Sequence, residues 1–313
     1  MPDAGGERPF ERVMPPRRVA LLVNPAARGA ERMRAGTLAA FAAAGVTCTE
    51  RLTTRAGEAA LMAAELGPGC DAVFTLGGDG TAMEVIDALA NSGVPVGILP
   101  GGTGNLVART LGIPRSAARA VPVLLDGALA QIDLGRLTTG RRFAFVAGVG
   151  IDAYMIARTP PAWKRRLGVI AYAAAAIDGV VRHQRFRVRA TVDGLTIESD
   201  ATAVMIANFG AVLGDLFVLG PDIRRDDGYL DLCIFTPDSI GASLRIVWRL
   251  WRRDFRDDPA VRWVRGRAIR IETDPSRQAQ ADGELLGETP IEVAVEPLAA
   301  TLLVPRTLPR ARR

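Results

Sequence analysis

The sequence predicts an α/β N-terminal domain with a doubly wound parallel sheet, then a β-rich C-terminal domain built as an antiparallel sandwich, with a cleft between them. Up to residue 130, short apolar runs alternate with helical segments, which is typical of a parallel sheet with crossover helices. From residue 131, strand-like runs follow one another, as in antiparallel sheets. Two glycine-rich loops lie at the carboxyl ends of expected parallel strands, where sheets of this kind bind ligands.

The N-terminal part divides into a leader and a series of strand–helix pairs. Residues 1–18 are polar and rich in proline and arginine, so we expect a flexible leader, and the domain itself spans 19–130. Apolar runs predict the strands, and alanine-rich or amphipathic segments between them predict the helices. The expected strands are 19–23, 46–52, 72–75 and 94–99, and the expected helices are 31–44, 58–66, 82–90 and 106–111.

The C-terminal part, residues 131–305, is expected to be mainly antiparallel sheet and to precede a basic tail at 306–313. Asp193-Gly194 stands between two strand-like runs and predicts a tight hairpin turn. The expected strands are 142–149, 186–192, 195–198, 201–207, 229–235, 268–272 and 291–295, and the expected helices are 163–181 and 239–255.

The charge balance and the rare residue types limit which partners and which kinds of catalytic site the protein can have. A net charge of +5 favours anionic partners, while 5% aromatic residues argue against a base-stacking surface for nucleic acid. Lys164, the only lysine, is not in a Walker A context, and His183, the only histidine, lies in a basic run typical of a surface. A histidine-rich metal site is therefore excluded. Three scattered cysteines and the absence of an apolar leader segment predict reduced thiols and a cytoplasmic location.

The first glycine loop, residues 76–81, follows an apolar run and precedes a helical segment. Its glycines allow the backbone to approach an anion closely, and the helix start presents amides to it. Asp79 in such a loop would repel phosphates unless a cation lay between them, which indicates a nucleotide triphosphate with Mg2+. The alternative is a structural turn in which Asp79 caps a helix. A second glycine loop at 101–105 follows the next strand, and the pair is more specific than either loop alone.

Two acidic turns and two basic helices have both a structural and a functional interpretation. Asp227 ends a carboxylate cluster and either forms a turn or binds a hard cation with backbone carbonyls. Asp282 and Glu284 flank a glycine, as in a hairpin, yet a carboxylate could also accept a hydroxyl proton where histidine and lysine are missing. The helix at 239–255 and the basic residues at 163–166 could contact a membrane or pack on the sheet.

With these motifs in order, the chain resembles the diacylglycerol kinase catalytic-domain family, which includes soluble bacterial lipid kinases and is related to sphingosine and ceramide kinases. The resemblance runs from about residue 19 to residue 305. It is carried by the motifs at 23–25, 77–81, 97–105, 148–152, 227–229 and 282–284.

The resemblance implies an ATP- and Mg2+-dependent kinase that phosphorylates a lipid hydroxyl. It places the proton acceptor on Glu284 with Asp282 beside it. In the expected mechanism, Asp79 positions the metal, as its place in the first glycine loop already indicates. It also implies a structural Mg2+ at Asp227, with main-chain oxygens of Arg224 and Tyr229. The implied ATP contacts are Asn24, Thr53, Gly77, Gly78, Asp79, Gly80, Thr81, Ala82, Met83, Gly102 and Thr103.

Two departures bear on these ATP contacts. Met83 stands where relatives often have asparagine, and the threonine contact falls on either Thr53 or Thr54. NAD kinases and phosphofructokinases share the first loop, but NAD kinases typically add an Asn-Glu pair that is absent here.

The expected reaction is conversion of diacylglycerol to phosphatidic acid, a step of phospholipid synthesis. The alternatives are a sphingoid-base or ceramide kinase and, in another class, a non-catalytic nucleotide sensor or a membrane adaptor. We expect peripheral contact with an anionic membrane and no nucleic-acid partner. The sequence leaves the oligomeric state open, a homodimer included.

Overall fold

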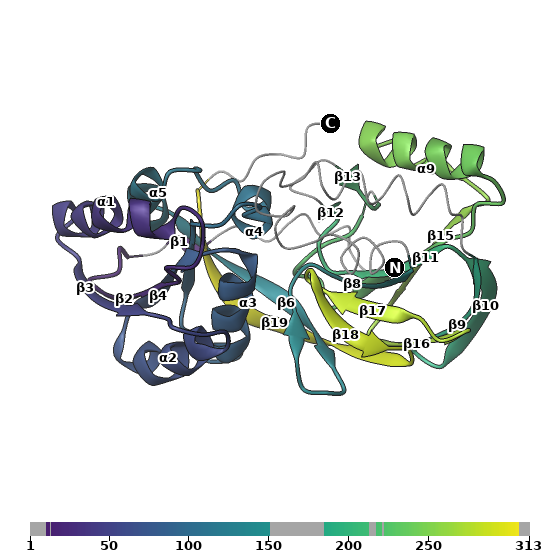
Figure 1. Ribbon diagram of the computed structural model, residues 1–313, viewed down its shortest axis with the longest axis horizontal. Coiled ribbons are helices and arrows are strands. Elements are labelled where there is room, and N and C mark those ends of the chain that lie inside the picture. The colour runs from purple at the N-terminus through teal and green to yellow at the C-terminus, as the bar shows by residue number, and fades with distance from the viewer. Residues whose placement is uncertain (1–10, 13, 151–184, 213–216, 221, 307–313) are drawn as a thin grey trace. The chain divides into compact units, whose positions relative to one another are not determined.

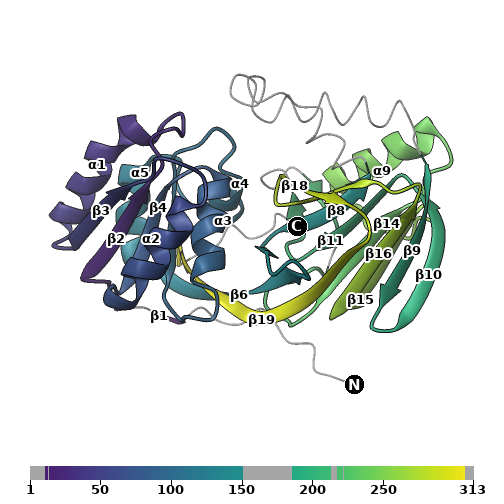
Figure 2. The same ribbon diagram turned by 60° about the horizontal axis from the view of Figure 1, so that its bottom comes forward.

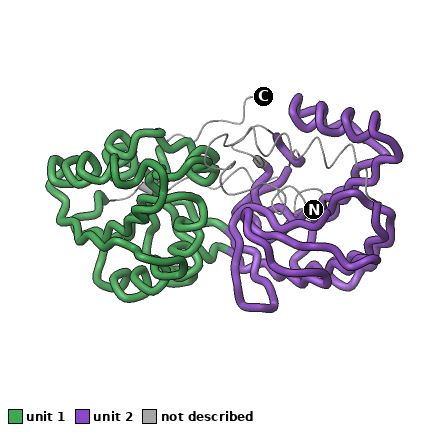
Figure 3. The backbone as a smooth tube through the Cα atoms, viewed as in Figure 1, with its two compact units in different colours: residues 1–132, 298–313 green, residues 133–297 purple. Residues whose placement is uncertain are grey.

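The computed structural model describes residues 11–12, 14–150, 185–212, 217–220 and 222–306 (Figure 1). The chain divides into two compact units (Figure 3): unit 1 comprises residues 1–132 and 298–313, and unit 2 comprises residues 133–297. The division at 132/133 lies two residues from the expected boundary, but the end of the chain returns to unit 1. This return is made by the long strand β19 (Ile291–Val304), in which Leu302 pairs in parallel with Val96.

Unit 1 contains the expected parallel sheet. Its strands are β2 (Arg18–Val23), β3 (Thr47–Leu52), β4 (Ala72–Gly77) and β5 (Val96–Pro100), in the order β3-β2-β4-β5, with the end of β19 beside β5. Every residue of β4 and β5 is buried, because helices cover both faces of the sheet. Continuous apolar runs are expected in strands that are buried on both faces, and this is why they predicted these strands correctly.

The helices of unit 1 pack in pairs, α1 (Ala30–Ala43) with α5 (Ala117–Leu125), and α2 (Glu58–Leu66) with α3 (Asp79–Ala88), as Figure 2 shows. A short helix α4 (Leu106–Thr110) follows β5, and a 3-10 turn η1 (Gly67–Gly69) follows α2. Helix α5 was not expected, because it contains a proline, Pro122, that disfavours a helix interior.

Two short stretches of unit 1 differ from the expectation. The leader was expected to be flexible through residue 18, but Glu11–Arg12 form β1 and pair with β6 (Ala128–Leu137). Strand β6 itself was not expected, since the sequence boundary at 130 falls inside it. Its residues up to 132 belong to unit 1 and the remainder to unit 2.

Unit 2 is the expected antiparallel sandwich. One sheet has the order β15-β14-β11-β8-β17-β18, and the facing layer has the order β10-β9-β16-β19. The strands not yet given are β7 (Arg142–Phe143), β8 (Val146–Gly150), β9 (Phe186–Val192), β10 (Leu195–Ala201), β11 (Ala203–Ala207), β12 (Ala211–Val212), β13 (Phe217–Val218), β14 (Leu230–Phe235), β15 (Val261–Gly266), β16 (Ala268–Asp274), β17 (Gln278–Ala281) and β18 (Glu284–Glu288).

Alternating side chains of β14 serve two cores. Leu232 and Ile234 point into the core between the two layers, and Cys233 and Phe235 point into a second core on the outer face. Helix α9 (Ile240–Arg252) covers this outer face and contributes Ile246 to it. The two-sided burial explains why β14 is apolar from Leu232 to Phe235.

Several expectations for unit 2 are confirmed or corrected in detail. The turn at Asp193-Gly194 joins β9 to β10 with positive φ at both residues, the geometry of a two-residue hairpin. Residues 142–149 were expected to form one strand, which is wrong: they form β7 and β8 with a break at Ala144 and Phe145. The expected helix at 163–181, including Lys164, lies outside the described residues, as does His183.

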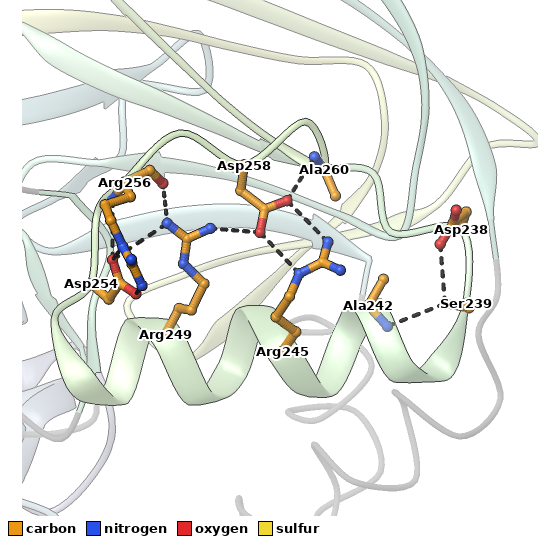
Figure 4. Close-up of polar contacts among 9 residues, drawn as sticks. All are labelled: Asp238, Ser239, Ala242, Arg245, Arg249, Asp254, Arg256, Asp258 and Ala260. Atoms are coloured by element: carbon orange, nitrogen blue, oxygen red, sulfur yellow. Dashed lines mark hydrogen bonds and ion pairs between the residues drawn. The ribbon is translucent and has the colours of Figure 1, made fainter.

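Helix α9 is fixed to unit 2 by polar contacts as well as by apolar packing (Figure 4). Ser239 caps the helix, because its Oγ accepts a hydrogen bond of 3.2 Å from the Ala242 amide. Arg245 and Arg249 both donate to the carboxylate of Asp258, at distances down to 2.7 Å. The interpretation of this segment as a helix that packs on the sheet is thus confirmed for one of its faces. Among the described residues, no helix is both long and apolar enough to cross a bilayer.

Candidate active site

The residues predicted to contact ATP follow the four parallel strands of unit 1. Asn24 follows β2, Thr53 follows β3, the loop from Gly77 follows β4, and the loop from Gly101 follows β5. Since parallel strands end at the same edge of a sheet, these loops gather along one edge. Helix α3 starts at this edge with Gly78 as its N-cap, and glycine has no side chain that could cap the helix.

The two glycine loops are packed backbone against backbone. The Gly101 amide donates to the Gly77 carbonyl at 2.8 Å. A Cβ on Gly101 would lie 2.9 Å from the Gly77 nitrogen, and a Cβ on Gly102 would lie 2.6 Å from the Gly78 Cα. Gly101 and Gly102 are therefore required by the contact between the loops, in addition to any role toward a ligand.

Gly101→Ala is expected to lower the free energy of unfolding by about 1–3 kcal/mol, because backbone atoms surround the added methyl group and cannot move aside easily. Gly69→Ala is the matched control, since a Cβ at Gly69 would meet nothing within 4 Å. Urea denaturation of the two variants checks this result. Equal stability of both would contradict close packing of the loops.

Asp79 connects the two loops through its carboxylate. Its Oδ1 accepts a 2.9 Å hydrogen bond from the Val107 amide, so the Asp79 side chain caps the start of α4. Burial raises the pKa of the Asp79 carboxyl above its ordinary value, and hydrogen bonds from Val107 and neighbouring amides only partly oppose this. The ionised carboxylate is thus incompletely compensated, and a bound cation would stabilise it.

Asn24 and the threonines that follow β3 have distinct contacts. The Asn24 Nδ2 donates to the Thr81 Oγ1 at 3.0 Å and joins the loop after β2 to α3. Thr53 is buried, and its Oγ1 lies 3.4 Å from the Val23 carbonyl. Thr54 is exposed and bonds to Glu58 through both its amide and its hydroxyl. The side chain of Thr54 is thereby used to hold the Glu58 carboxylate at the start of α2.

The other predicted ATP contacts differ in exposure. Ala82 is buried, Met83 and Gly102 are half-buried, and Thr103 is exposed. Gly80 lies in the first turn of α3. Contact between these residues and ATP stays a prediction.

In unit 2, Asp282 and Gly283 form the two-residue turn of the hairpin β17–β18, with φ of 45° and 88°. The Asp282 carboxylate accepts hydrogen bonds of 2.7–3.0 Å from the amides of Ala144, Phe145 and Val146. Three consecutive amides can reach one carboxylate only where the strand is interrupted, which explains the break between β7 and β8. Asp282 thus holds the hairpin against this break.

Asp282→Ala is expected to lower the free energy of unfolding by about 2–4 kcal/mol, since three amides lose a charged acceptor and alanine disfavours a positive φ. Asp282→Asn keeps one acceptor oxygen and tolerates this backbone conformation, so it should cost less. Chemical denaturation of both variants measures the difference. An alanine variant as stable as wild type would contradict the clamp.

Glu284 follows this turn and is exposed at the start of β18. Its Oε2 lies 2.5 Å from the Arg141 guanidinium, and the two side chains keep 56% and 37% of their surface exposed. This ion pair fixes the direction of the Glu284 carboxylate, and the exposure leaves it accessible to a reactant. Glu284 as a proton acceptor stays a prediction.

Asp227 is half-buried in the turn before β14. Its Oδ1 accepts from the Tyr229 amide at 3.1 Å, and its Oδ2 lies 3.3 Å from Arg265. Burial raises the pKa of Asp227, while Arg265 opposes that shift. Within the described residues, no group of three histidine, cysteine, aspartate or glutamate side chains could hold a metal ion. A Mg2+ at Asp227 would therefore rely on carbonyls such as those of Arg224 and Tyr229, and would share the carboxylate with Arg265.

The sequence analysis missed three residues that support these turns. Arg141 directs Glu284, Arg265 pairs with Asp231 directly across β14 and β15, and the buried Asn208 donates to the carbonyls of Asp133 and Ala144. Each acts across strands far apart in sequence, so no local pattern indicates it. Only Asn208 had a local signal, because a polar asparagine directly after the apolar strand β11 indicates a buried residue with hydrogen-bond partners.

Two family models match this chain in succession. Residues 18–137 match the diacylglycerol kinase catalytic domain, and residues 145–304, more than half of the chain, match the YegS C-terminal NAD kinase beta sandwich-like domain. The two matches divide the chain close to the boundary between the compact units.

Individual relatives extend along most of the chain. A diacylglycerol kinase of Mycobacterium tuberculosis is 29% identical over 299 residues, covering 92% of this chain and 96% of its own. An uncharacterized protein of Synechocystis is 31% identical over 244 residues, and the match spans 56% of that longer relative.

Solved structures show the same fold. A crystal structure of a candidate diacylglycerol kinase from Bacillus anthracis has a TM-score of 0.80 at 27% identity, covering 93% of this chain and 96% of its own. A second Bacillus anthracis structure has a TM-score of 0.72 at 24% identity and supports the fold alone. Matching family models over both units, with relatives along nearly the whole length, place the chain in the family of diacylglycerol kinase-type lipid kinases with a YegS-type C-terminal domain, which are ATP-dependent phosphotransferases.

Proposed function

We propose that this protein uses ATP and Mg2+ to phosphorylate the free hydroxyl of diacylglycerol, giving phosphatidic acid. The observation that carries the choice of lipid is the Mycobacterium tuberculosis relative, which is named a diacylglycerol kinase and aligns over 92% of this chain. The sites predicted for ATP and for a proton acceptor are consistent with this reaction.

ATP would bind along the carboxyl edge of the unit 1 sheet. Because the N-cap of α3 is a glycine without a side chain, phosphate oxygens could approach the amides at the start of this helix and accept their hydrogen bonds. Asp79, whose buried carboxylate is incompletely compensated, would hold the Mg2+ of the nucleotide. That ion would supply positive charge to the phosphate oxygens during transfer.

Glu284 would act as the general base. Its carboxylate takes the proton of the lipid hydroxyl as that oxygen bonds to the γ-phosphorus and the bond to ADP breaks. Asp282 holds the hairpin that carries Glu284, and Arg141 directs its carboxylate. We further propose a structural Mg2+ at Asp227, in addition to that of the nucleotide.

The test is phosphoryl transfer by the purified full chain. The protein is incubated with ATP and either Mg2+ or EDTA, with diacylglycerol, sphingosine or ceramide in mixed micelles, and products are identified by mass spectrometry. Phosphatidic acid formed only with Mg2+ is the expected result. Phosphorylation of sphingosine or ceramide instead would replace the proposed substrate, and no transfer to any lipid would overturn the kinase proposal.

We also propose that the enzyme works at the cytoplasmic side of an anionic membrane, because its lipid substrate resides in a bilayer and its net charge is +5. Electrostatic docking should weaken as salt rises from 0.1 to 0.5 M. Light scattering of the purified chain distinguishes a monomer from a homodimer.

A further inference from the structure

Helix α9 has a second apolar face that does not contact the core. Five large apolar side chains are exposed along it: Ile240 at 42%, Leu244 at 54%, Val247 at 39%, Trp248 at 55% and Trp251 at 52%. They are half of the large hydrophobic residues exposed in the described part of the chain. Single exposed apolar residues are common, whereas a cluster on one helix marks an interaction surface. These five residues are named the α9 stripe.

The spacing of the stripe places it on one side of the helix. Counted from Ile240, its members stand at i, i+4, i+7, i+8 and i+11, which fall on one face of an α-helix. The residues that pack on unit 2, Ala242 and Ile246 among them, lie on a different face. Packing on the sheet therefore explains one apolar face of α9 and leaves the stripe unexplained.

The charges around the stripe favour an anionic or zwitterionic partner. Helix α9 contains no acidic residue. Arg245 and Arg249 are held by Asp258, on the side of the helix that faces unit 2 (Figure 4). Arg252 is exposed, and its guanidinium lies 5.6 Å from the centre of the Trp248 ring, at the border of the stripe.

We propose that the α9 stripe inserts into the interfacial region of a lipid bilayer, with the helix lying in the membrane plane. This inference rests on the proposed function, because a lipid kinase must reach a substrate held in a bilayer. Tryptophan at the end of an apolar stripe and arginine at its border are suited to the boundary between acyl chains and headgroups. Since two of the helix arginines, Arg245 and Arg249, are held by Asp258 away from the stripe, the stripe itself presents mainly apolar surface to the bilayer.

Vesicle flotation tests the surface directly. Full-length wild type is compared with the double variant Leu244→Ser/Trp248→Ser and with the control Leu61→Ser/Leu195→Ser, whose two leucines are each 65% exposed elsewhere. Vesicles contain phosphatidylcholine alone or with one quarter phosphatidylglycerol. We expect the stripe variant to bind both at least about 10-fold more weakly, from the loss of two large apolar groups, and the control to bind as wild type does.

Insertion depth gives a second measurement that does not depend on catalysis. Phosphatidylcholine brominated in its acyl chains quenches tryptophan that reaches them. Wild type should be quenched more strongly than Trp248→Phe/Trp251→Phe, which keeps the stripe apolar and should still bind vesicles. Equal quenching of the two proteins would overturn insertion of the stripe.

The remaining outcomes separate this inference from the proposed function. Activity on a dispersed short-chain diacylglycerol should be the same in wild type and the stripe variant, while activity on vesicle-bound diacylglycerol should fall about 10-fold. If the protein phosphorylates none of the lipids but still binds vesicles through the stripe, the kinase proposal is refuted and the proposed membrane-binding surface is supported. Unchanged vesicle binding by the stripe variant would overturn the proposal that the stripe inserts into the bilayer. The same holds if light scattering shows that the substitutions change only the oligomeric state of the protein.

Discussion

Glu284→Gln is expected to lower kcat for lipid phosphorylation by about 100- to 10,000-fold, the usual contribution of a general base. Glutamine has the shape of glutamate but cannot take the hydroxyl proton. Its partner Arg141 is half-exposed, and an ion pair of this kind contributes at most about 1 kcal/mol, so the fold should persist. Steady-state transfer of labelled phosphate to diacylglycerol measures the change.

The matched control for this variant is Glu288→Gln. Glu288 is exposed on the same strand, β18, and has no proposed role in the reaction. Its activity should equal that of wild type. Full activity of Glu284→Gln, with folding verified by circular dichroism, would remove Glu284 from the mechanism.

Asp79→Asn is expected to lower kcat by at least about 100-fold while retaining the fold. The amide oxygen of asparagine can still accept the hydrogen bond from Val107 and cap α4, but it carries no charge to hold Mg2+. Asp79→Ala should lose both properties, with an additional loss of about 1 kcal/mol in the free energy of unfolding. Activity across a Mg2+ titration and urea denaturation separate the two effects.

Glu65→Gln, an exposed position on α2, is the control for charge removal in unit 1 and should change neither quantity. An Asp79→Asn enzyme as active as wild type would leave Asp79 as a structural cap alone. The comparison thus decides between the two interpretations of the first glycine loop.

Much of the fold could be predicted because it depends on local patterns. Apolar runs such as that of β4 are buried on both faces, so their composition alone marks a parallel strand. The helix at Glu58–Leu66 and the hairpin at Asp193-Gly194 agree with their sequence signals, since helix periodicity and positive-φ turns are set by neighbouring residues. The break between β7 and β8 was missed, because it depends on a carboxylate more than 130 residues away.

The sequence by itself determined the order of the two units, the glycine loops at the strand ends and the resemblance to lipid kinases, from which a role for the acidic turns in phosphoryl transfer is predicted. Only the tertiary structure decided that Asp79 caps α4, that Asp282 clamps a strand break, and that Arg141 directs Glu284. It also divided the apolar residues of α9 between a buried face and an exposed stripe. The physical reason is that a motif fixes which groups are present, whereas hydrogen-bond partners and burial depend on segments that meet only after folding.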